Sequence, residues 1–104
     1  MLNDEAAMEA ARALAKRMVE EGGDDVKARV IYGFRICAAR TPQEKEVERI
    51  VALYQQQLNH FTANSTEAGK IVRNHSTKAG GAEFAAWTMV ANVLLNLDET
   101  LTKE

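Results

Sequence analysis

Few residues of this chain have the chemistry of a catalytic or metal-binding site, and they stand apart in the sequence. The chain holds one cysteine, Cys37, and two histidines, His60 and His75, which lie fifteen positions apart. A zinc or iron site needs three or four ligands, and neither histidine has a partner ligand three or four positions further along. Cys37 falls on the apolar side of an expected helix, where a thiol is a packing residue. We therefore expect no metal, no cofactor and no catalytic centre in this chain.

Two glycine pairs, Gly22-Gly23 and Gly80-Gly81, are too short to predict a phosphate-binding loop. Such a loop needs a longer glycine pattern that leads into a helix, usually with a lysine. The second pair precedes an expected helix and offers a generic anion site at most. Serine, histidine and aspartate are present, but no strand–turn–helix pattern presents a nucleophile. We interpret the glycine pairs as a helix cap and a hinge, and we predict that the chain is not an enzyme.

The most basic stretch of the chain does not predict nucleic-acid binding. It comprises Lys27, Arg29, Arg35 and Arg40. Arginine clusters bind phosphate or carboxylate in a bidentate manner, but the carboxylates at 24–25 lie close enough in sequence to neutralise this one. The whole chain has 13 Lys+Arg against 15 Asp+Glu, a formal net charge of −2. A DNA or RNA reader needs a stronger positive field, so we expect intramolecular ion pairing instead.

Three polar residues, Asn92, Asn96 and Asp98, interrupt the most apolar segment of the chain. A buried asparagine without hydrogen-bond partners costs about 1–3 kcal/mol. We therefore expect Asn92 or Asn96 to bond the backbone at the end of another helix, and Asp98 to pair with Arg12 or Arg35. This predicted network specifies the fold; a ligand site made by the same residues is the less favoured reading.

The elements that must position these residues are all helical, because apolar residues recur at spacings of three and four and no segment alternates as a strand does. We predict five helices, four long and one short, in a compact orthogonal or up-and-down bundle. The first is capped by Asn3 or Asp4 and ends at Gly22-Gly23. The other starts are expected at Asp24-Asp25, at Thr41-Pro42-Gln43-Glu44, at Asn64-Ser65 and near residue 82. At the second of these four starts, Thr41 is the expected cap, Pro42 the first helical residue and Glu44 the partner in a capping box.

The last expected helix, about residues 82–97, is apolar on most of its circumference, which is typical of a central helix or of half an interface. We expect Phe84 and Trp87 to lie in the core. If they are exposed instead, they mark the interface where a partner docks, since large exposed apolar patches rarely lack a partner. No run of about 18 apolar residues predicts a membrane span, and residues 1–5 have no signal-peptide pattern.

Four sequence blocks, in their order and spacing, resemble the C-terminal part of a domain of unknown function in large planctomycete cytochrome-c-type proteins. The blocks are Leu2-Asn3-Asp4, Ala11-Arg12-Ala13-Leu14-Ala15, Arg29 with Phe34-Arg35 and Arg40-Thr41-Pro42, and the run at 86–99 that ends in Leu94-Leu95-Asn96-Leu97-Asp98-Glu99. The resemblance covers essentially the whole chain. Two positions depart from the family pattern: Ala39 stands where family members often have glycine, and Thr100 where an aromatic residue is common. Alanine suits a helix end, so we expect neither departure to change the fold.

The resemblance implies a multidomain, exported or periplasmic parent protein in which a separate haem domain can occur. No C-x-x-C-H haem-attachment motif is present here, so no redox activity carries over to these residues. We predict that residues 1–104 form a single helical domain, a fragment or module of a larger protein. Its predicted role is non-catalytic packing against other domains of that parent or against a second copy. The alternative is a small-molecule or carbohydrate-binding domain with a cleft between the second helix and the loop around His75, and a nucleic-acid-binding bundle comes third.

Overall fold

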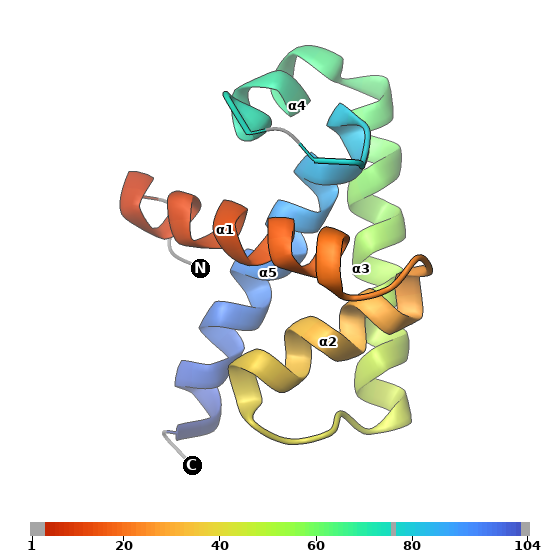
Figure 1. The fold of residues 1–104 in the computed structure, drawn as a ribbon, viewed down its shortest axis with the longest axis vertical. Coiled ribbons are helices and arrows are strands. Elements are labelled where there is room, and N and C mark those ends of the chain that lie inside the picture. Colours follow the sequence, from red (N-terminus) through yellow and green to blue (C-terminus); the bar gives the residue numbers. More distant parts are fainter. Residues whose placement is uncertain (1–3, 76, 103–104) are drawn as a thin grey trace.

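The computed structural model describes residues 4–75 and 77–102, and these form five α-helices (Figure 1). The helices are α1 (Glu5–Glu21), α2 (Val26–Ala38), α3 (Glu44–Ala63), α4 (Ser65–Val72) and α5 (Gly81–Thr102). The predicted all-α fold with four long helices and one short helix is confirmed. No strand is present in the part of the chain that the structure describes.

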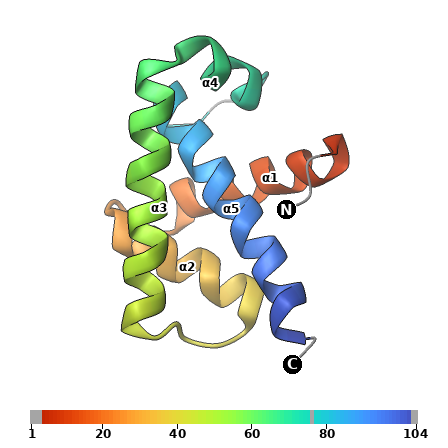
Figure 2. The same ribbon diagram turned by 180° about the vertical axis from the view of Figure 1, so that it is seen from behind.

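The helices form a crossed arrangement instead of a simple up-and-down bundle. Figures 1 and 2 show α3 and α5 running in opposite directions along the long axis, with α1 and α2 across them on one side and α4 at one end. α5 packs against each of the other four helices. The orthogonal form of the predicted bundle is therefore the one adopted.

Local hydrogen bonds place the starts of the first two helices. The side chain of Asp4 accepts a hydrogen bond from the Ala7 backbone N–H at 2.8 Å, and Asp25 accepts one from Ala28 at 2.7 Å. Each carboxylate satisfies a backbone donor that has no partner within its helix and also matches the helix dipole. Both caps were predicted; the alternative cap, Asn3, lies outside the described residues.

The start of α3 differs from the prediction by two residues. Gln43, not Thr41, is the residue that precedes the helix, and its backbone N–H donates to Glu46 Oε1 at 2.8 Å. The carboxylate that closes the capping box is therefore Glu46 instead of Glu44. Pro42 lies before the cap, where it is buried, and not in the first turn.

The ends of α1 and α2 both use left-handed backbone. Gly23 has φ of 102° after α1, as the glycine pair predicted, and Ala39 has φ of 55° after α2. Ala39 was expected to suit an ordinary helix end, and that prediction is wrong. Its Cβ is strained in the left-handed region, and this is the physical reason that a glycine fits the position better.

α5 fills the middle of the core. It extends to Thr102, five residues beyond the predicted end. Phe84 and Trp87 are buried, and the Trp87 ring stacks on Tyr54 with centroids 4.1 Å apart. They are core residues, so they form no docking surface. Among the described residues, no helix has the length and apolar character that crossing a bilayer requires.

The strain at Ala39 predicts that Ala39→Gly raises the free energy of unfolding by about 0.5–1 kcal/mol, because glycine adopts positive φ without a steric cost. The matched control is Ala38→Gly, one residue earlier and inside α2, which should lower stability by about 1 kcal/mol. Urea unfolding followed by circular dichroism measures both changes. A loss of stability in both variants would contradict the left-handed assignment.

Candidate functional site

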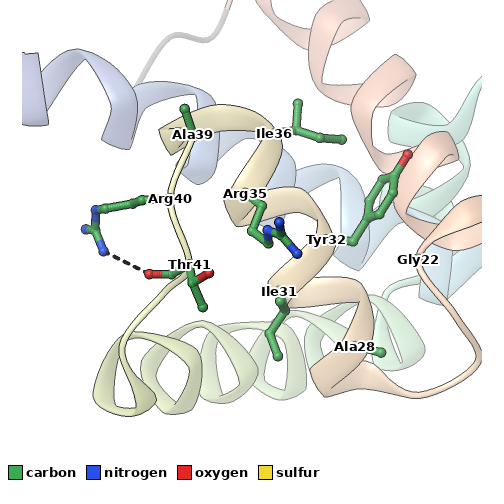
Figure 3. A pocket seen from close by; sticks show the side chains of 9 residues that line it. All are labelled: Gly22, Ala28, Ile31, Tyr32, Arg35, Ile36, Ala39, Arg40 and Thr41. Carbon is green, nitrogen blue, oxygen red and sulfur yellow. Dashed lines mark hydrogen bonds between the residues drawn. The ribbon is translucent and has the colours of Figure 1, made fainter.

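The largest concave surface we describe lies on the outer side of α2, away from the core (Figure 3). It is an open groove with a volume of about 770 Å³. Its walls are made by Gly22, Ala28, Ile31, Tyr32, Arg35, Ile36, Ala39, Arg40 and Thr41. Six of these nine residues belong to α2 and its C-terminal cap, so a single helix positions most of the surface.

The groove exists because α2 has two apolar faces. Val30 and Phe34 are fully buried on the inner face. The groove residues of α2 recur at spacings of three and four, which places them together on the opposite side of the helix. Ile36 is 41% exposed there. This groove was not predicted from the sequence; the signal for it was the repeated spacing of residues from Ala28 to Ala39.

The charged groups that line the groove are both arginines, and they differ in their surroundings. Arg40 is held by Glu46 through two hydrogen bonds of 3.0 and 2.8 Å, and its guanidinium lies 4.9 Å from the Phe34 ring centroid. Arg35 is exposed and lies between Ile31, Ile36 and Tyr32 in Figure 3. Among the described residues, no carboxylate stands within ion-pair distance of Arg35.

Two hydrogen-bond systems at the ends of the groove shift pKa values. The Arg40 guanidinium, helped by the Gln43 backbone N–H, lowers the pKa of Glu46 from 4.5 to about 2. The hydroxyl of Tyr32 donates to Glu21, and this hydrogen bond raises the pKa of Tyr32 because the neighbouring carboxylate favours the neutral phenol. The raised pKa keeps the Tyr32 hydroxyl protonated at neutral pH.

Arg12 belongs to a different network from the one predicted. Its side chain is only 2% exposed; its Nε donates to the carbonyl oxygen of Ile71, and its Nη1 donates to Glu5 and Glu9 at 3.0 and 2.9 Å. The guanidinium therefore caps the C-terminal end of α4 and joins it to α1. The expected partner, Asp98, has a side chain outside the described residues.

The two asparagines of the predicted network bond each other, and Asn92 also lies against α1. Asn96 Nδ2 donates to the backbone oxygen and the side-chain Oδ1 of Asn92, at 2.7 and 2.8 Å, so these bonds run within α5 and not to another helix's end. Asn92 is buried, with its Nδ2 3.3 Å from the sulfur of Met8 in α1. Arg35 lies on the outer side of α2, in the groove. The pairing of Asp98 with Arg12 or Arg35 stays a prediction, because the side chain of Asp98 lies outside the described residues.

The two histidines lie far apart, each beside one glutamate. His60 is 3.4 Å from Glu67, while His75 is 3.0 Å from Glu9 and stacks on the Phe84 ring. Cys37 is half-buried and packs against the core. The described part of the chain holds no group of three or more histidine, cysteine, aspartate or glutamate side chains arranged to hold a metal ion.

Comparison with known proteins gives no relative: no family model matches the chain, and no curated protein or solved structure matches it.

The buried position of Arg12 predicts that Arg12→Met lowers the free energy of unfolding by about 1–3 kcal/mol, because the Ile71 carbonyl loses its charged donor. Arg17→Met is the control, since Arg17 is 54% exposed and pairs with Glu21 on the surface. This control should change stability by less than about 0.5 kcal/mol. Urea unfolding measures both variants, and equal losses in the two would contradict an anchoring role for Arg12.

The lowered pKa of Glu46 predicts a pH-dependent contribution to stability. Because its pKa is lower in the folded chain (about 2) than its ordinary value of 4.5, the stabilisation is complete above pH 4.5 and is lost as the pH falls towards 2. The difference in unfolding free energy between the wild type and Glu46→Gln should therefore shrink across that interval. In an Arg40→Gln background the same comparison should depend much less on pH. A difference that is constant from pH 5 to 2 would contradict the assignment.

Proposed function

We propose that this chain is a non-catalytic helical module that packs against another part of a larger, exported protein through the outer face of α2. The observation that carries the proposal is the second apolar face of α2, with Ile36 left 41% exposed beside a groove of about 770 Å³. Ile31 and Tyr32 on this face still pack partly against the core, but Ile36 is left exposed and contributes little to the stability of the fold. Such a surface is typical of an interaction site.

The chemistry of the groove supports a binding role over a catalytic one. Its lining side chains are apolar or are hydroxyl and guanidinium groups, and none of the described ones is a carboxylate, histidine or cysteine. General acid–base catalysis at neutral pH needs a group that can lose and regain a proton there. The context of a larger exported parent rests on the family resemblance of the four sequence blocks.

A small molecule is the second candidate occupant, because the Tyr32 ring and the Arg35 guanidinium lie next to each other in the groove. A sugar or an aromatic acid commonly uses such a pair. Ligand sites of that kind enclose most of the ligand surface, whereas this groove is open along the outside of α2. The loop around His75, which was the other expected wall of a cleft, contributes no residue to it.

The proposal is tested by hydroxyl-radical footprinting of the natural protein that contains these residues. If the outer face of α2 is covered by another part of that protein, Tyr32 and Ile36 should be oxidised more slowly than their exposure in this structure implies. His60, at 47% exposed, and Leu95, at 36%, provide internal references on other helices. If Tyr32 and Ile36 are oxidised as fast, relative to His60 and Leu95, as their exposure in this structure implies, the proposal is overturned.

A further inference from the structure

We infer that the partner segment that occupies the α2 groove is an amphipathic helix that carries a carboxylate among its apolar residues, and that Arg35 selects it. The inference rests on the proposed function and adds the chemistry of the partner. It is argued from the shape of the α2 face, from its charge and from the geometry of self-association.

The shape of the groove matches a helix of about three turns. Its α2 wall runs from Ala28 to the cap at Ala39, which is about 16 Å of helix at 1.5 Å per residue. The alanines at the two ends leave room for a close approach, and the larger side chains Ile31 and Ile36 stand between them. Helix-in-groove binding uses anchors at this same three-and-four spacing.

The charge of the groove indicates the sign of the partner. Although the chain has a formal net charge of −2, the two charged residues found in the groove wall are arginines. Arg40 already has its carboxylate, Glu46. Arg35 stands between apolar side chains, so a docked partner removes its guanidinium from water. That desolvation is offset where the partner supplies a carboxylate in bidentate contact.

A second copy of this chain fits the groove poorly. In a two-fold dimer the same face meets itself. Because the described lining of this face holds two arginines and no carboxylate, a second copy offers Arg35 no opposite charge when the contact removes it from water. A different, acidic segment is therefore the better occupant.

The experiment is selection from a displayed library of helical peptides about three turns long, with the full 104-residue chain as bait and Ile36→Ser as the counter-selection bait. We expect the enriched peptides to share an apolar stripe with a central Asp or Glu. Replacing that carboxylate by its amide in a selected peptide should weaken binding to the wild type by about fivefold, measured by fluorescence anisotropy. The same replacement should have little effect on binding to Arg35→Gln. Arg49→Gln removes an exposed arginine outside the groove and should behave as the wild type does.

The outcomes separate the two levels of the argument. Enriched peptides that lose affinity with Ile36→Ser but carry no carboxylate would overturn the inference about the partner and leave the docking face intact. A carboxylate preference that survives in Arg35→Gln would likewise overturn the role of Arg35. A selection in which no peptide distinguishes the wild type from Ile36→Ser counts against the docking face itself. Circular dichroism of each variant verifies that the chain remains folded.

Discussion

The fold depends on α5 being apolar on nearly all sides. Because this one helix packs against each of the other four, α1 and α2 can both lie across it, and they also pack against each other. The approach of α2 is close: a Cβ on Gly33 would lie 2.7 Å from the Met18 sulfur and 3.0 Å from Leu94. The inner side of α2 is therefore fixed by steric fit to the core. The outer side of α2 is not constrained by this close packing, so its side chains can differ in polarity and charge from those of the inner side.

Polar contacts hold the part of the fold that the apolar core reaches least. α4 is short, and Ala68 is its buried residue. At its C-terminal end the carbonyl of Ile71 needs a donor, as the last carbonyls of a helix generally do. Arg12 supplies that donor from α1, and the carboxylates of Glu5 and Glu9 both accept from its Nη1. The buried charge is tolerated there because two carboxylates and a carbonyl oxygen surround it, not because the pairing itself adds much stability.

The features that could be predicted from the sequence are those in which the interacting residues lie close together along the chain. The caps at Asp4 and Asp25 and the glycine after α1 depend on residues within a turn of each other, so composition and spacing identify them. The partner of Arg12 was not predictable, because Ile71 is 59 residues away and only the packing of α4 on α1 brings the two together. The backbone strain at Ala39 was missed for a related reason: a helix end can be recognised in sequence, but the sign of φ at that end is set by how the following segment returns to α3.

The two arginines at the end of α2 differ in what the fold requires of them. Arg35 lies in the last turn of α2, where its positive charge interacts favourably with the helix dipole. It therefore needs no carboxylate from its own chain to be stable in water. Arg40, just beyond the helix, is used by Glu46 to hold the first turn of α3. The carboxylate of Glu46 thus fixes the loop that forms one wall of the groove. It also pairs with the guanidinium of Arg40, which would otherwise compete with Arg35 for a carboxylate of the partner. In the proposed docking, discrimination between partners would therefore depend on Arg35 alone, whose charge is solvated while the groove is open.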